Sequence, residues 1–370
     1  MLVAATAVAA EAVEAVDAVD AGHDTPAIQQ SGRAEHGTDT WRVTWPAVAW
    51  RAAFSGTSVA VVTQDTAGYQ VEIDRREMAP IQPSQAEQTS WYRGLGSGAH
   101  LIEIVRKNVT PGHAGLFLGF RLDAPDGRWL KPPAPPLRQI EFISDSQSTG
   151  YGDLSSGGDC ADDQVAALSD ASQSFPVLTA RRLHADWQLN AMNGIGVVRN
   201  WHGIWKDSNY ASYYPRTLLN DPASRYHSVD WRPQVVVIGL GANDFSTPLA
   251  ADEAWTPAQL QSEFRRSYRS LIADVRRRYG RRALIVALRP SLDENQANQE
   301  VARIVQQLRS QGDRQLYFLQ FPPLQRTGCM THPNIADHRL MSTVLAQFIE
   351  QHARLPSASL PGDRHRFDQQ

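Results

Sequence analysis

The sequence has few cysteines, no excess of one charge and no long hydrophobic run. Its two cysteines, Cys160 and Cys329, are too few for a disulfide scaffold or a zinc ribbon, although they suffice for a single bridge. Because no run of about 18 or more apolar residues occurs, the sequence predicts no bilayer-spanning helix. The 36 basic and 39 acidic side chains give a formal net charge of -3. This balance indicates neither nucleic acid nor an anionic membrane as a partner.

The N-terminal segment has a composition unlike the rest of the chain. Its first ten residues, MLVAATAVAA, are apolar and end in small residues, like the later part of a secretory signal without the charged leading region. An Ala-rich helix or a disordered segment would have the same composition. Residues 11–38 show no sustained periodicity. We interpret residues 1–38 as a flexible leader or degenerate signal, and we expect a secreted or periplasmic protein.

Two domains are predicted after this leader. Between residues 39 and 130, short β-branched and aromatic runs alternate with Gly, Pro and Asp, which is typical of a β-sandwich. Residues 131–137, KPPAPPL, contain four prolines and form a stiff linker. In residues 138–353, apolar strands alternate with helical segments, which predicts an α/β domain with a parallel sheet covered on both faces. Residues 354–370 are polar and are predicted to be a disordered tail.

Chemistry in a parallel α/β sheet collects where the strands end, and four polar blocks lie at such places. Ser146 follows the strand IEFIS, Gly194 follows WQLNAM, and Asn243 follows QVVVIGLG. His332, with a proline after it, precedes the last helix. In this order the blocks resemble those of the SGNH (GDSL-type) hydrolases, which implies a flavodoxin-like three-layer α/β/α fold.

The sequence segments around these blocks narrow the resemblance to one family. The chain is similar to carbohydrate esterase family 2 in several segments. These are the sandwich with FSGTSVAVVTQD and YQVEID, the Pro-rich linker, the GYG after the serine, NGIGVVRN, GANDFS and GCMTHPN. This resemblance covers the chain from about residue 32 onward. It implies an N-terminal jelly-roll domain, an SGNH catalytic domain and removal of acetyl groups from plant polysaccharides or oligosaccharides, as by an acetyl xylan esterase. It implies no metal and no cofactor.

The resemblance also assigns roles. Ser146 is the expected nucleophile of an acyl-enzyme mechanism and His332 the expected base. The oxyanion is expected to bind the N–H groups of Ser146 and Gly194 and the side chain of Asn243. The alternatives are structural: Ser146 would cap the following helix, Asn243 would close a turn, and Gly196 would take the place of Gly194. His338, the competing histidine, is expected to pack.

One departure from the SGNH pattern concerns the acid. An aspartate usually stands two or three residues before the histidine, but these positions are Met330 and Cys329. We therefore predict a Ser–His dyad whose ring is oriented by a backbone carbonyl, as in some members of the esterase family.

Two further expectations concern the edges of the site. A disulfide between Cys160 and Cys329 would tether the histidine loop, and two free buried thiols are the alternative. Aromatic side chains suit sugar rings, and one or two of a group near the site are expected to line the substrate groove. This group is Tyr151, Trp201, Trp205, Tyr210 and Tyr213.

Two other functions remain open from the sequence. The missing aspartate would also fit a carbohydrate-binding protein with an impaired hydrolase site. An SGNH esterase acting on a non-carbohydrate ester is the other alternative, although the sequence contains no extended apolar lid of the kind that lipases carry.

Overall fold

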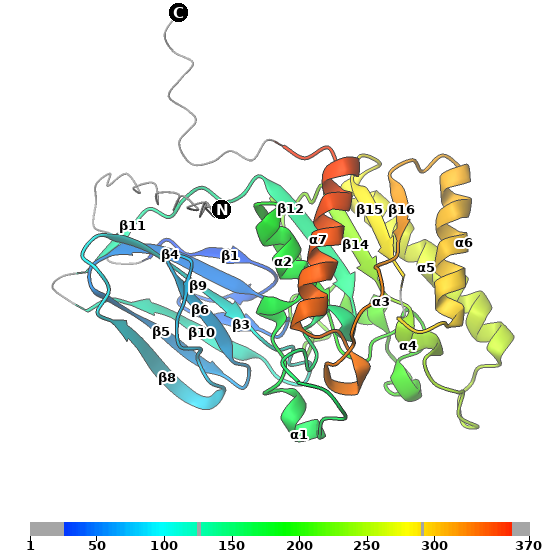
Figure 1. The fold of residues 1–370 in the computed structure, drawn as a ribbon, viewed down its shortest axis with the longest axis horizontal. Coiled ribbons are helices and arrows are strands. Elements are labelled where there is room, and N and C mark those ends of the chain that lie inside the picture. The colour runs from blue at the N-terminus through cyan, green and yellow to red at the C-terminus, as the bar shows by residue number, and fades with distance from the viewer. Residues whose placement is uncertain (1–25, 124–126, 290–291, 357–370) are drawn as a thin grey trace, which may run out of the picture.

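A computed structural model describes residues 26–123, 127–289 and 292–356. The earlier strands form two antiparallel sheets, and the later strands form a single parallel sheet flanked by helices (Figure 1). None of the helices in these ranges is long and apolar enough to cross a membrane.

The two antiparallel sheets pack face to face as a sandwich. The first sheet has the order β1 (Gln29–Ser31), β4 (Ala49–Ser55), β9 (Ala99–Arg106), β6 (Tyr69–Ile73) and β7 (Arg76–Glu77), with β11 (Arg128–Leu130) also paired to β4. The second has the order β2 (Glu35–His36), β3 (Trp41–Val43), β10 (Gly115–Arg121), β5 (Ser58–Asp65) and β8 (Ser84–Arg93). In β6 buried Tyr69, Val71 and Ile73 alternate with half-buried residues, as expected for a strand with one face on a core. The predicted all-β sandwich is confirmed.

Two strands lie in the segment that the sequence predicts as a flexible leader. That prediction is wrong for residues 26–38, because β1 pairs with β4 and β2 pairs with β3. Arg33, between these strands, is fully buried and its guanidinium pairs with Glu141 at 3.1 Å. Polar edge strands carry no hydrophobic periodicity, so the pattern gave no signal. Residues 1–25 lie outside the described residues.

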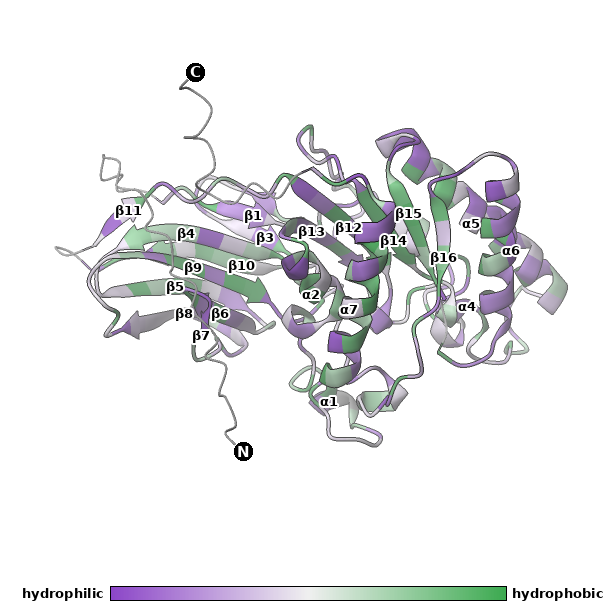
Figure 2. Ribbon diagram, turned by 45° about the horizontal axis from the view of Figure 1, so that its top comes forward, coloured by the Kyte–Doolittle hydropathy of each residue, from purple (hydrophilic) through white to green (hydrophobic). Residues whose placement is uncertain are grey.

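The parallel sheet has the strand order β13 (Ala185–Ala191), β12 (Arg138–Ser144), β14 (Val235–Gly239), β15 (Leu284–Leu288) and β16 (Leu316–Leu319). Counted along the chain this order is 2-1-3-4-5, the flavodoxin-like arrangement. The predicted α/β fold with a parallel sheet is therefore confirmed. Hydrophobic residues fill β14 and β15, whereas α5 (Pro257–Tyr279) and α6 (Gln296–Ser310) carry many hydrophilic residues (Figure 2).

Helices cover both faces of this sheet. On one face α2 (Phe175–Arg182) and α7 (Ile335–His352) share a core with residues such as Val235 and Val237. On the other, α5 and α6 share a core with the alternate residues Val236 and Ile238. Short helices occur in the loops: α1 (Asp162–Val165), α3 (Tyr210–Tyr213) and α4 (Ala242–Phe245), with the 3₁₀ turns η1 (Ser146–Ser148), η2 (Ala171–Gln173), η3 (Trp201–Gly203) and η4 (Cys329–Thr331).

The sandwich and the α/β domain contact each other directly. Trp45 Nε1 donates to the Thr217 carbonyl at 3.0 Å, and Trp187 Nε1 donates to the Ala47 carbonyl at 2.9 Å. At the other end of the chain, the first described residues of the predicted disordered tail are held. Arg138 Nε donates to the Pro356 carbonyl at 2.9 Å, so that prediction is wrong for residues 354–356, and residues 357–370 lie outside the described residues.

Candidate active site

The four predicted site residues come together at the carboxyl-terminal edge of the parallel sheet. Ser146 opens η1 directly after β12, and Asp145 caps that turn by accepting from Gln147 N–H at 3.0 Å. Gly194 follows β13, and Asn243 lies in α4 after β14. Because β13, β12 and β14 are adjacent and parallel, the loops after them meet at one place.

Ser146 and His332 form a hydrogen bond across a sequence separation of 186 residues. The distance from His332 Nε2 to Ser146 Oγ is 2.9 Å, and His332 Nδ1 lies 3.0 Å from the Cys329 carbonyl oxygen. A carbonyl can only accept, so Nδ1 carries the proton and Nε2 is left to accept from the serine hydroxyl. This is the tautomer that a general base for Ser146 needs. Within the described ranges no carboxylate hydrogen-bonds to this ring.

The loop that carries His332 is held on several sides. Cys329 is bonded to Cys160, with the two Cα atoms 5.3 Å apart, and its N–H donates to the Gly152 carbonyl at 3.1 Å. Gly152 has φ +59°, and a Cβ there would lie 2.2 Å from the Cβ of Cys329. The nucleophile loop and the histidine loop therefore touch at a position that only glycine fits.

The backbone of the histidine loop is strained. Met330 and Thr331 have φ values of 49° and 57°, which is unfavourable above all for a β-branched residue. Arg326 stabilises this conformation, since its Nε donates to the Thr331 carbonyl at 3.1 Å. The following helix, α7, starts with a capping box in which Asn334 and Asp337 satisfy each other's backbone N–H groups.

The three predicted oxyanion donors differ in how free they are. Among the described residues, the N–H groups of Ser146 and Gly194 have no protein acceptor. The N–H of Gly196, the alternative glycine, already donates to Asn200 Oδ1 at 2.9 Å. Asn243 Nδ2 donates to the Ile195 carbonyl at 2.8 Å and, over a longer 3.3 Å, to Asp145 Oδ2. The second amide hydrogen can turn to an oxyanion only by releasing Asp145.

Comparison with known proteins agrees with this geometry. The family model described as Carbohydrate esterase 2 N-terminal matches residues 30–133, and that of the GDSL-like Lipase/Acylhydrolase matches residues 140–345. A protein of Cellvibrio japonicus named acetylxylan esterase / glucomannan deacetylase is 33% identical over 321 residues, which are 84% of this chain and 86% of that protein. The chain belongs to carbohydrate esterase family 2.

Two further proteins are similar to this chain over most of its length. The cellulase/esterase CelE of Acetivibrio thermocellus is 30% identical over 347 residues, which are 88% of this chain but 40% of that longer protein. A solved structure of a family two carbohydrate esterase from Clostridium thermocellum in complex with cellohexaose has a TM-score of 0.79 and 28% identity. The match covers 88% of this chain and 98% of that chain.

The electrostatics of the esterase keep His332 neutral. Burial lowers the pKa of His332 below its ordinary value near 6.5, although the Cys329 carbonyl acts in the opposite direction. His338, the competing histidine, is only 1% exposed and its Nδ1 accepts from Phe175 N–H. Burial lowers the pKa of His338 to about 3, which fits the packing role expected for it.

Two buried aspartates, to which the sequence assigns no role, lie beside the predicted oxyanion donors. Asp244 accepts from the N–H groups of Val197, Val198 and Arg199 at 2.7–3.0 Å, and so fixes the loop that follows Gly194. Burial, reinforced by the nearby Asp244, raises the pKa of Asp145 to about 7. Asp145 thus changes charge near neutrality while it touches the Asn243 amide.

The predicted aromatic contacts divide into two groups. The ring of Tyr151 lies 4.5 Å from that of His332, and Trp201 and Trp205, both more than a third exposed, flank Gly194. Tyr210 is buried and donates to the Asn190 carbonyl, so the prediction that it contacts substrate is wrong. Tyr213 is half-buried and packs against the hydrophobic core. Both tyrosines are close to the site in sequence, but their helix α3 packs inward.

The described residues contain no group of three or more His, Cys, Asp or Glu side chains arranged to hold a metal ion.

Proposed function

We propose that Ser146 and His332 are the catalytic dyad of a carbohydrate O-acetylesterase. The observation that carries this proposal is the 2.9 Å hydrogen bond from Ser146 Oγ to His332 Nε2, with the opposite ring nitrogen held by the Cys329 carbonyl. Ser146 Oγ attacks the acetyl carbonyl carbon, and its proton passes to His332 Nε2. The N–H groups of Ser146 and Gly194 and the Asn243 amide bind the oxyanion.

The proton on His332 Nε2 first goes to the leaving sugar, and water then removes the acetyl group from the serine. The tetrahedral intermediate collapses, the C–O bond to the sugar breaks, and the sugar oxygen takes the proton from His332 Nε2. A water molecule then attacks the acetyl-serine and gives a proton to Nε2. The C–Oγ bond breaks, Nε2 returns that proton to Ser146 Oγ, and the acetyl group leaves as acetic acid, which ionises to acetate in solution. A neutral carbonyl stabilises the intermediate imidazolium less than a carboxylate would, but it fixes the same tautomer.

The names of the relatives support an acetylated plant polysaccharide or oligosaccharide as the substrate. The Cellvibrio protein is named for xylan and glucomannan, and the Clostridium structure holds cellohexaose. Exposed Trp201 and Trp205 beside Gly194 are suited to stacking against sugar rings. The disulfide between Cys160 and Cys329 supports an oxidising, secreted or periplasmic location.

A non-catalytic carbohydrate-binding function is the second candidate, favoured by the absence of a carboxylate beside His332 among the described residues. Acetate release from acetylated xylan, glucomannan and xyloglucan, measured in parallel, separates the two. The esterase proposal predicts release from at least one of them and its loss in folded Ser146→Ala. Binding without release by the unaltered protein would support the second candidate. Faster hydrolysis of butyrate than of acetate aryl esters would instead indicate a non-carbohydrate ester.

A further inference from the structure

A cavity of about 250 Å³ lies where the sandwich meets the α/β domain. The α/β domain contributes most of its lining, from the loop after Ser146, from α1 and the loop after it, and from the loop after β13. The sandwich contributes two residues that follow β9. The lining residues are Thr149, Tyr151, Val165, Ala166, Ser169 and Asn193, with Asn108 and Val109 from the sandwich.

This cavity adjoins the dyad. Thr149 Oγ1 lies 3.3 Å from the carbonyl oxygen of the nucleophile Ser146. The ring of Tyr151 faces that of His332 at 4.5 Å. Asn193 directly precedes the oxyanion donor Gly194. Three residues that line the cavity, Thr149, Tyr151 and Asn193, therefore neighbour the proposed nucleophile, base and oxyanion donor.

The lining combines apolar area with unused polar atoms. Asn193 Oδ1 accepts from Thr149 at 2.7 Å, whereas its Nδ2 has no acceptor among the described residues. Asn108 donates through Nδ2 to the Ala166 carbonyl at 2.9 Å, and its Oδ1 meets no donor in the same ranges. Val109, Val165 and the Tyr151 ring supply apolar surface. An amide donor and an amide acceptor beside apolar walls complement a ring that carries hydroxyl groups and C–H faces.

We infer that this cavity is a subsite for one sugar ring of the acetylated chain, other than the ring that bears the scissile ester, and that Asn108 and Val109 make the sandwich part of the substrate site. The inference rests on the proposed function. The volume lies just below the roughly 300–1,000 Å³ of pockets for drug-sized ligands, which fits a single ring. An acetyl group needs far less space, and the polar atoms do not suit a longer acyl chain.

The sandwich residues are held firmly at this place. Lys107, which precedes Asn108, pairs through Nζ with Asp170 Oδ2 at 3.3 Å. The Lys107 carbonyl accepts from Ala171 N–H at 2.9 Å. The two sandwich residues are thus fixed to the α/β domain by the adjacent backbone and by a neighbouring ion pair, as a preorganised subsite requires.

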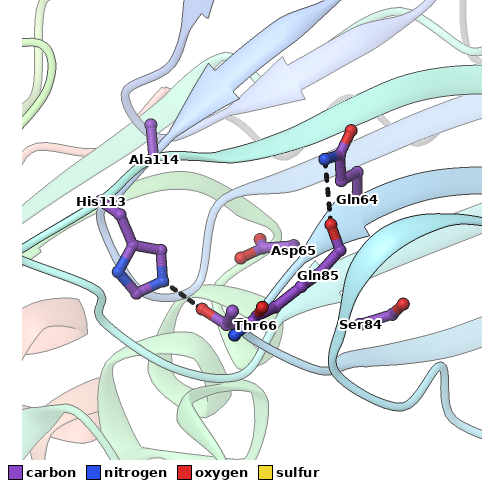
Figure 3. A pocket seen from close by; sticks show the side chains of 7 residues that line it. All are labelled: Gln64, Asp65, Thr66, Ser84, Gln85, His113 and Ala114. Atoms are coloured by element: carbon purple, nitrogen blue, oxygen red, sulfur yellow. Dashed lines mark hydrogen bonds between the residues drawn. The ribbon is translucent and has the colours of Figure 1, made fainter.

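A second cavity, on the sandwich alone, lacks these features. It has a volume of about 270 Å³, and several of its polar side chains are bonded to one another or to other groups of the sandwich (Figure 3). His113 bonds to Thr66, Gln64 donates to the Gln85 carbonyl, and Asp65 is taken by the buried Arg106. Its lining is Gln64, Asp65, Thr66, Ser84, Gln85, His113 and Ala114. It offers a matched place for a control substitution.

The test is Val109→Trp, which fills the proposed subsite. Two kcat/KM values are measured, one for acetylated xylo-oligosaccharides and one for 4-nitrophenyl acetate, which has no second ring. We expect their ratio to fall at least about tenfold, mainly through KM for the oligosaccharide, as for a lost contact in a specificity pocket. Gln85→Trp, in the second cavity, is the control and is expected to leave the ratio unchanged.

Each other outcome overturns the inference. An unchanged ratio in Val109→Trp means that no ring occupies the cavity, and an equal loss on both substrates means that the residue only supports the fold. A changed preference between acetate and butyrate aryl esters means that the cavity holds the acyl group. Asn108→Ser, which removes the amide and leaves the cavity unfilled, is measured in the same way if Val109→Trp does not fold. Failure of the proposed function is separate, since it appears in the unaltered protein as no acetate release from any carbohydrate.

Discussion

The main-chain oxygen of Cys329 lies 3.0 Å from Nδ1 of His332, where a triad hydrolase has a carboxylate. Because this acceptor is part of the backbone, the orientation of the catalytic ring depends on the conformation of its own loop. That loop contains two residues with positive φ and is tied down by a disulfide and by Arg326. A change in the conformation of this loop is therefore expected to change the activity as well.

The pH dependence of the esterase follows from the pKa of His332. Only the neutral ring can accept the Ser146 proton, and burial moves its pKa below the ordinary value near 6.5. Activity should therefore rise with pH through a midpoint below 6.5 and be complete above it. Measurement of kcat/KM for an aryl acetate between about pH 4 and 9 gives this midpoint. A midpoint above about 7 would mean that the ring is stabilised as imidazolium, as by an unrecognised carboxylate.

Asn243→Ala should reduce kcat far more than it changes KM. Loss of one oxyanion donor costs about 2.7–4 kcal/mol of transition-state stabilisation, which corresponds to roughly 10²–10³ in rate. Because Asn243 also binds the Ile195 carbonyl, the thermal midpoint of the variant must be compared with that of the unaltered protein. A kcat within about threefold of the original in a folded variant would remove Asn243 from the oxyanion site.

Asp145 should make the protein less stable as the pH rises. Its pKa is raised to about 7 in the folded state by burial and by Asp244, against an unfolded value near 4. Between these values the folded state binds more protons than the unfolded state, so the free energy of unfolding falls as the pH rises. In Asp145→Asn the free energy of unfolding, measured with denaturant across that pH window, should therefore fall less steeply with pH. An unchanged slope would assign the titration to another group.

Removal of the disulfide should impair both stability and turnover. The bond joins residues 169 positions apart, and a disulfide typically contributes about 2–4 kcal/mol of stability. The double variant Cys160→Ser with Cys329→Ser should melt at a lower temperature. Its kcat should also fall, because the carbonyl that orients His332 belongs to the released residue. The unaltered protein after mild reduction should behave in the same way, and an unchanged kcat in both would show that the loop holds its conformation without the bond.

The sequence predicted those features that leave a local pattern. Apolar runs marked the strands β12, β14 and β15, and the residues after them marked Ser146 and Asn243. The carbonyl partner of His332 was predicted from the missing aspartate at Met330 and Cys329 together with the resemblance to an esterase family in which some members use a backbone carbonyl. Arg33 was missed because its pairing with Glu141 spans 108 residues and leaves no periodic signal. The inward position of Tyr210 and the arrival of Asn108 beside the nucleophile loop depend on tertiary packing, which no short window of sequence contains.

Labelling with a fluorophosphonate, followed by mass spectrometry of the modified peptide, tests the dyad most directly. Such reagents react with a serine whose neighbouring base removes its proton. We predict one label per chain, on Ser146, and at most slow labelling in His332→Ala. A label on a different serine, or rapid labelling of Ser146 in folded His332→Ala, would contradict the assignment of these two residues as nucleophile and base.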